Sequence, residues 1–159
     1  MRHSRRMQWL ACLSVCSLAA AAVLSTRWVE YSVNFTTSLP GTLYVIHKGE
    51  AVAKGDLIAY RWHGGASYPA GSVFIKKTVG VAGDRVRRDG RAFWVNDTYV
   101  GVAKTHSRAG LPLKPAAEGV IPAGEYFVAT PNPDSLDSRY ALTGNVRQSE
   151  VIGRAYEVF

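Results

Sequence analysis

The sequence predicts an all-β domain, barrel-like or sandwich, that follows one N-terminal helix. After residue 26 the apolar and β-branched residues come in short runs bounded by turn residues, as in proteins built from many short strands. Before that point, residues 9–26 form an uncharged stretch of 18 residues, which is marginally long enough for a transmembrane helix. The remaining part of about 130 residues is large enough for one hydrophobic core.

The N-terminal segment predicts a membrane anchor. Residues 1–8 carry Arg2, Arg5 and Arg6 and no acidic residue, so we expect this end in the cytoplasm and the remainder exported. The chain then divides into a basic cytoplasmic segment (1–8), a transmembrane anchor (9–26) and an exported domain (27–159). This arrangement predicts a single-pass protein of the inner (cytoplasmic) membrane, with its folded domain in the periplasm and the lipid bilayer as a partner.

A cleaved signal peptide is the alternative interpretation, because small residues crowd positions 19–22. The apolar run is longer than the usual signal-peptide core, however, and Trp28 and Tyr31 follow it in the manner of interfacial anchors. These two features favour an uncleaved helix.

The exported domain contains strand-like runs in regular succession. They cover residues 42–47, 56–62, 72–81, 85–88, 91–95, 98–102, 125–130 and 151–159. The dipeptides at 89–90 (Asp-Gly) and 96–97 (Asn-Asp) are two-residue turn signals that connect three of these runs into a meander. Residues 103–119 and 131–145 are expected to be loops.

Charge and composition exclude several classes of function. Sixteen Lys and Arg face twelve acidic residues beyond position 26, a net charge of +4 that suits a domain near anionic lipid headgroups. The basic residues alternate with apolar ones, so we expect no nucleic-acid partner. Both cysteines, Cys12 and Cys16, lie inside the N-terminal helix, and the four histidines show no ligand spacing. We therefore expect no metal site and no cofactor.

Two stretches of the exported domain carry reactive side chains in a suggestive order. Ser38 stands in a Thr-Thr-Ser-Leu-Pro-Gly segment, and the third strand carries two adjacent lysines, Lys76 and Lys77. A serine hydroxyl needs a neighbouring base to act as a nucleophile, and a desolvated lysine is one such base. Successive strand residues face opposite ways, so only one of the two lysines can face a serine site. Alternation alone does not say which.

These stretches resemble type I signal peptidases. Residues 38–40 (Ser-Leu-Pro) resemble the serine box of that family, and residues 74–84 (FIKKTVGVAGD) resemble its lysine box. Residues 121–128, 135–140 and 151–156 resemble the remaining boxes in the family's order. The short serine box, with leucine at 39 and Gly-Thr-Leu-Tyr after the proline, looks most like the conjugal-transfer (TraF-type) branch.

The resemblance implies a role for six residues. Ser38 would be the nucleophile, Lys76 the general base, and Thr36 an oxyanion-hole donor. Ser135 would orient the lysine amine, and Asp137 and Arg139 would form a supporting pair. The sequence departs from the family pattern at residues 130–132 (Thr-Pro-Asn), so the resemblance does not give the geometry of the loop around Ser135.

The resemblance further implies a fold and a function. We expect a signal-peptidase-like, partly open barrel or sandwich that acts as a membrane-anchored serine endopeptidase with a Ser-Lys dyad. Its substrate would be an exported precursor or a pro-pilin of a conjugation system. A self-cleaving repressor-type protease is one alternative, but no DNA-binding module precedes the domain. The other is a non-enzymatic, membrane-anchored β-domain that scaffolds a secretion or pilus complex.

Overall fold

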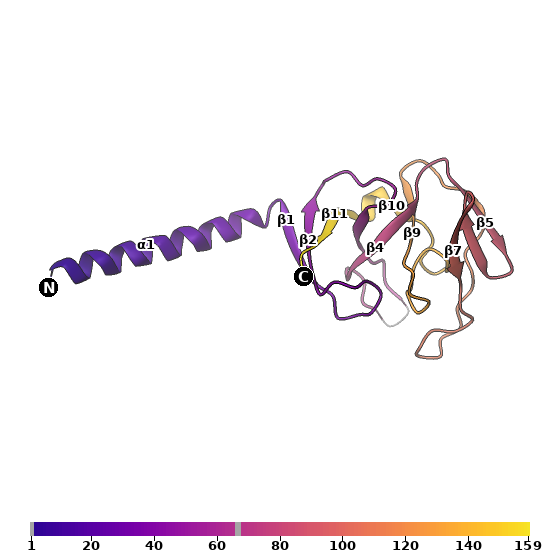
Figure 1. The fold of residues 1–159 in the computed structure, drawn as a ribbon, viewed down its shortest axis with the longest axis horizontal. Helices are drawn as coiled ribbons and strands as arrows, with labels where there is room; N and C mark the ends of the chain where they lie inside the picture. The colour runs from indigo at the N-terminus through magenta and orange to yellow at the C-terminus, as the bar shows by residue number, and fades with distance from the viewer. Residues whose placement is uncertain (1, 66–67) are drawn as a thin grey trace.

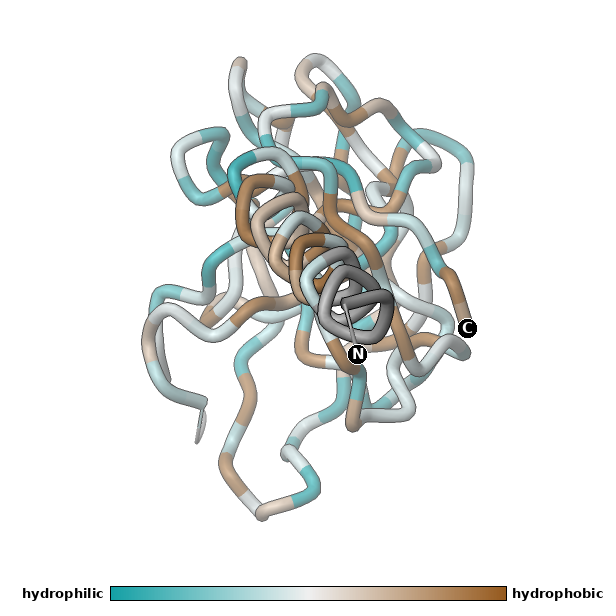
Figure 2. Tube along the Cα trace, turned by 90° about the vertical axis from the view of Figure 1, so that its left-hand side faces the viewer, coloured by the Kyte–Doolittle hydropathy of each residue, from teal (hydrophilic) through white to brown (hydrophobic). Residues whose placement is uncertain are grey.

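The computed structural model describes residues 2–65 and 68–159, which form one long helix and a β domain (Figure 1). Helix α1 (Arg2–Ser25) stands clear of the β domain as a straight rod. Figure 2 looks along this helix and shows its mixture of hydrophobic and intermediate residues. Within the described residues, α1 and every other helix fall short of the combined length and apolarity that a membrane crossing requires. The anchor at residues 9–26 therefore stays a prediction.

The β domain consists of two antiparallel sheets. The larger has seven strands in the order β1-β2-β11-β3-β4-β9-β10, and the smaller has four in the order β7-β6-β5-β8. The strands are β1 (Val29–Val33), β2 (Leu43–Lys48), β3 (Leu57–Arg61), β4 (Val73–Gly80), β5 (Arg85–Asp89), β6 (Ala92–Val95), β7 (Thr98–Val102), β8 (Gly119–Val120), β9 (Glu125–Ala129), β10 (Val146–Arg147) and β11 (Val151–Glu157). A short 3₁₀ helix, Gln148–Glu150, precedes the last strand.

Eight of these strands lie where the sequence predicts them, and the mostly β fold is confirmed. The predicted meander is the β5-β6-β7 part of the smaller sheet, with Asn96 in the left-handed conformation (φ 53°) that its turn requires. Three strands were not expected: β1, β8 and β10. Strand β1 covers Tyr31, which the sequence suggested as an interfacial residue; it is exposed, as is Trp28.

The larger sheet is covered on both faces, and β3 shows how. Ala59 belongs to one core cluster together with Tyr44 and Ile46 of β2. Its neighbours Ile58 and Tyr60 face the other way and belong to a second cluster. Alternate residues of one strand thus contribute to two core clusters, one on each face of the sheet. A third core cluster lies between β9 and the smaller sheet.

Strand β4 follows the same alternation at the lysine pair. Its burial changes abruptly between Lys76, which is only 6% exposed, and Lys77, which is exposed. Lys76 is paired with Ile58 of β3, in the middle of the sheet. The expectation that the two lysines differ in environment is therefore met.

Candidate active site

A cavity of about 490 Å³ lies where four parts of the β domain meet. Its lining comes from residues 32–39 at the end of β1 and in the loop that follows it, from residues 72–76 at the start of β4, and from the loop after β9, with Tyr44, Tyr68 and Arg108 completing it. Of the predicted site residues, Ser38, Lys76, Thr36 and Ser135 all line this cavity. Asp137 and Arg139 lie behind it, fully buried.

Ser38 lies in the loop between β1 and β2, and its hydroxyl is bonded to Thr36. The two side-chain oxygens are 2.9 Å apart. The Ser38 backbone N–H points at the same Thr36 oxygen over a longer 3.5 Å. Thr36 therefore lies beside both the hydroxyl and the backbone N–H of Ser38.

Lys76 supplies the cavity with a buried amine. Burial lowers its pKa from 10.5 to about 8, because the charged form is desolvated; nearby Asp137 opposes this shift and Arg139 adds to it. The amine also lies 5.7 Å from the centre of the Phe74 ring. A lysine in this environment carries a substantial neutral fraction near pH 8, which a base requires.

No hydrogen bond joins Ser38 Oγ to Lys76 Nζ in the part of the chain that the structure describes. The close approach that would distinguish an enzyme from a scaffold on geometry alone is thus not seen. Catalytic hydrogen bonds are often long or poorly aligned without substrate and shorten only when it binds, so a catalytic serine and lysine need not be bonded in the free protein. What the structure places together is a half-buried serine and a buried lysine on one cavity.

Ser135 is buried, and its hydroxyl has no hydrogen-bond partner among the described residues. The hydrogen bond to the lysine amine that the resemblance implies is not formed here. A buried hydroxyl without a hydrogen-bond partner is unfavourable, so the Ser135 hydroxyl is free to bond with a polar group that moves next to it.

The loop that carries Ser135 is braced by a buried ion pair. Arg139 donates from Nε and Nη2 to the two carboxylate oxygens of Asp137, each at 2.8 Å. Arg139 also donates to the backbone carbonyl of Asn132 at 3.2 Å, and Asp137 accepts the N–H of Thr130 at 3.3 Å. The pair thus spans both ends of the segment that departs from the family pattern.

Asn132 connects this loop to the serine loop. Its amide nitrogen donates to the carbonyl oxygen of Thr37 at 2.7 Å and lies 3.2 Å from the Thr37 hydroxyl. No local sequence pattern predicts this contact, because 95 positions separate the two residues. Through Asn132 the buried pair behind the cavity is coupled to the neighbour of Ser38.

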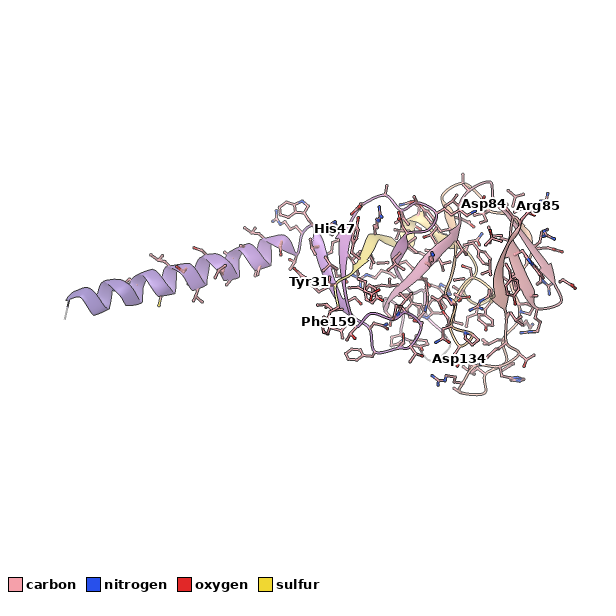
Figure 3. All side chains as sticks on the ribbon, in the orientation of Figure 1. Tyr31, His47, Asp84, Arg85, Asp134 and Phe159 are labelled. Carbon is pink, nitrogen blue, oxygen red and sulfur yellow. The ribbon has the colours of Figure 1, made fainter. Side chains whose placement is uncertain are left out.

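Asp134 is one of the residues that line the cavity, and Figure 3 labels it at the lower side of the β domain. Its carboxylate is bonded to Lys104 and lies 3.6 Å from Arg108 Nε. The Lys104 hydrogen bond lowers the pKa of Asp134 below its ordinary value. Asp134 therefore contributes a carboxylate to the lining that is already paired with basic side chains.

No cluster of His, Cys, Asp and Glu able to hold a metal ion occurs among residues 2–65 and 68–159. The side chains that line the cavity around Ser38 are mainly hydroxyl, amide and apolar, with one buried amine. That set suits nucleophilic attack on a carbonyl better than it suits metal coordination.

Comparison with known proteins gives three similarities. The family model described as "Signal peptidase, peptidase S26" matches residues 6–159. A probable conjugal transfer protein TraF from Sinorhizobium fredii (strain NBRC 101917 / NGR234) is 30% identical over 176 aligned positions, covering 99% of this chain and 92% of that protein. The crystal structure of a signal peptidase I from Enterococcus faecalis V583 matches with a TM-score of 0.41 and 22% identity, over 66% of this chain and 97% of that chain. A structural likeness of this degree supports no conclusion about the site.

Proposed function

Because this chain belongs to the signal peptidase family, peptidase S26, and is thus a serine peptidase that processes exported precursors, we propose that Ser38 and Lys76 form its catalytic dyad. The observation that carries this proposal is the burial of Lys76 on the same cavity as Ser38, with an amine pKa lowered to about 8. An exposed lysine stays protonated at neutral pH and cannot accept a proton. Family membership also sets aside the alternative of a non-enzymatic scaffold.

In the proposed reaction, Lys76 Nζ accepts the hydroxyl proton of Ser38 as Ser38 Oγ bonds to the scissile carbonyl carbon. The negative charge on the carbonyl oxygen is stabilised by the Ser38 backbone N–H and the Thr36 hydroxyl. The lysine then gives its proton to the leaving amine as the carbon–nitrogen bond breaks. Water, deprotonated by the same lysine, releases the acid product from the serine ester.

The reaction begins with the Ser38 hydroxyl leaving Thr36 for the lysine amine. The unpartnered hydroxyl of Ser135 fits a role beside that amine, since it could hold the lysine in place without adding charge. The Asp137–Arg139 pair would keep the Ser135 loop in position. These roles extend the proposal to all six residues.

We further propose that the substrate is a precursor of a conjugation system, such as a pro-pilin, cut after small residues close to the membrane. The support is the name of the TraF relative, a conjugal transfer protein. Membrane attachment through residues 9–26 is part of this proposal, on the uncharged stretch and the arginines before it. Extraction of the full chain from membranes with alkaline carbonate tests it, because an integral protein stays with the lipid.

The central experiment co-expresses the full chain with candidate precursors from the same replicon and measures the products by mass spectrometry. Ser38→Ala should abolish cleavage while the thermal unfolding temperature stays close to that of the wild type. Ser149→Ala, at an exposed serine of the 3₁₀ helix outside the cavity lining, is the matched control and should cleave normally. Cleavage by the Ser38→Ala variant at the wild-type rate would refute the assignment.

A further inference from the structure

Asn34 is the first residue of the serine loop, which covers residues 34–42 between β1 and β2. It is half-buried, follows β1 directly, and lines the cavity. Its amide nitrogen donates to the carbonyl oxygens of Leu39 at 3.1 Å and Gly41 at 3.0 Å. Its side-chain oxygen accepts the backbone N–H of Thr36 at 3.0 Å and the Thr36 hydroxyl at 2.7 Å.

These four bonds use the full hydrogen-bonding capacity of a primary amide, which has two donor hydrogens and two acceptor lone pairs. They also define its orientation. If the amide were turned over, its oxygen would face two carbonyl oxygens and its nitrogen would face an N–H. Only asparagine at this position satisfies both sides of the loop, because a carboxylate of the same size offers no donor.

The bonds also determine where the hydroxyl protons lie. Asn34 Oδ1 cannot donate, so the single hydroxyl proton of Thr36 is directed at Asn34. The 2.9 Å contact between Thr36 and Ser38 must then be made with the Ser38 proton. The order of donation is Ser38 to Thr36 to Asn34.

We propose that Asn34 is a positioning residue for the nucleophile: it closes the loop over residues 34–42 and, by accepting the Thr36 proton, holds Thr36 as the acceptor for the Ser38 hydroxyl. The inference rests on the proposed role of Ser38. When substrate binds and Ser38 gives its proton to the lysine, the Thr36 hydroxyl is free to turn from Asn34 toward the developing oxyanion. Asn34 acts through Thr36 and the loop, without contact to the reacting atoms.

The second support is the other end of the loop. The backbone N–H of Asn34 donates to the carbonyl of Thr42 at 2.8 Å, which joins the two ends of the loop as a strand pair would. Gly41, whose carbonyl accepts from Asn34, gives its own N–H to the buried hydroxyl of Tyr44 at 2.9 Å. The loop is therefore fixed by polar contacts at its base, while Phe35 and Thr37 at its outer side are exposed.

The test uses the full chain with a precursor that the wild type cleaves, and compares Asn34→Ala, Asn34→Asp and the control Asn145→Ala. Asn145 is likewise half-buried, donates its amide to Glu125 at 2.9 Å, and lies outside the cavity lining. We expect kcat of Asn34→Ala to fall about a hundredfold, because a misplacement of reacting groups by about 1 Å can lower a rate by that factor. KM should change little, and the pH midpoint of the activity should not move, since the lysine environment is untouched.

Asn34→Asp retains both acceptor bonds to Thr36 and loses both donor bonds to the loop carbonyls. It should therefore also lose activity, and it provides a second variant if the alanine protein does not fold. Amide hydrogen exchange at Thr36 gives a readout without substrate: its protection should be lost in Asn34→Ala and retained in Asn145→Ala.

The outcomes separate the two proposals. A wild-type chain that cleaves no precursor would count against the proposed function alone, and exchange at Thr36 would still decide whether Asn34 holds the loop. A cleaving wild type with an equally active Asn34→Ala variant would overturn the inference. So would a variant whose KM and unfolding temperature change while kcat does not.

Discussion

The Arg139 guanidinium is paired through two parallel hydrogen bonds with the Asp137 carboxylate, and the two side chains are 2% and 0% exposed. This pairing has an electrostatic consequence at the cavity. Asp137 favours a protonated Lys76 and Arg139 opposes it, so the two partners act on the pKa of the amine in opposite directions. Burial is then left as the dominant influence on the lysine.

Breaking this pair should destabilise the domain strongly. Arg139→Met leaves the Asp137 carboxylate buried without its partner, and losses of about 3–5 kcal/mol are typical of such changes. Equilibrium unfolding in urea measures the free energy of unfolding. Arg85→Met, at an exposed arginine of β5 (Figure 3), is the control and should change it little. Similar losses in both variants would contradict a special role for the buried pair.

The two lysines of β4 should respond differently to the same substitution. Lys76→Arg should abolish cleavage, because a guanidinium with a pKa above about 12 cannot act as a base at working pH. Lys77→Arg should be nearly silent, since this side chain is exposed. Cleavage assays with folding checked by circular dichroism decide it. Equal losses of cleavage activity in the two variants, or an inactive Lys77→Arg beside an active Lys76→Arg, would refute both the assignment of Lys76 as the base and the mechanism.

The activity of the wild type should rise with pH as Lys76 loses its proton. The midpoint of kcat/KM is expected at about pH 8, because the group that titrates is the buried amine of Lys76. The rate should be low at pH 6 and level off above pH 9. A profile that is flat between pH 6 and 9, or that rises only near pH 10, would show that no buried lysine controls the reaction.

Replacing Lys76 by methionine should stabilise the folded protein at neutral pH. Below pH 8 the lysine is protonated in both states, and the folded state carries the desolvation penalty. A pKa lowered from 10.5 to about 8 corresponds to a penalty on the order of 3 kcal/mol. Thermal unfolding at pH 7 should therefore give a higher melting temperature for Lys76→Met than for the wild type.

The sign of this effect predicts its pH dependence. Between pH 8 and 10.5 the unfolded chain binds a proton that the folded chain has lost, so the wild type gains stability as pH rises. The difference between wild type and Lys76→Met should shrink over this range. A difference independent of pH would assign the effect to packing and not to the buried charge.

Local pattern was sufficient for most of the β domain. The short apolar runs and the Asp-Gly and Asn-Asp turns predicted eight strands, because turn type and alternation are properties of neighbouring residues. Alternation also predicted that Lys76 and Lys77 differ in exposure. The three missed strands had no such signal: β8 and β10 have two residues each, and β1 contains Glu30, whose charge is accommodated by Arg61 of β3.

The site was only partly accessible from sequence. The resemblance identified Ser38, Lys76, Thr36 and Ser135, and the structure brings all four to one cavity. It could not give the proton order through Thr36 or the contact from Asn132 to Thr37, which depend on loop conformations. Asparagine is common in turns, so neither Asn34 nor Asn132 stands out before the loop geometry is known.

The place of β11 in the larger sheet constrains when the cavity can exist. This strand lies between β2 and β3, so residues 151–157 separate the strand that follows the serine loop from the strand paired with Lys76. Until residues 151–157 have been synthesised and have joined the sheet, β2 is not connected through β11 and β3 to β4. Such long-range closure is slow compared with local hairpin formation. We therefore expect a chain that lacks residues 151–157 to have no assembled cavity between the serine loop and β4, and no peptidase activity.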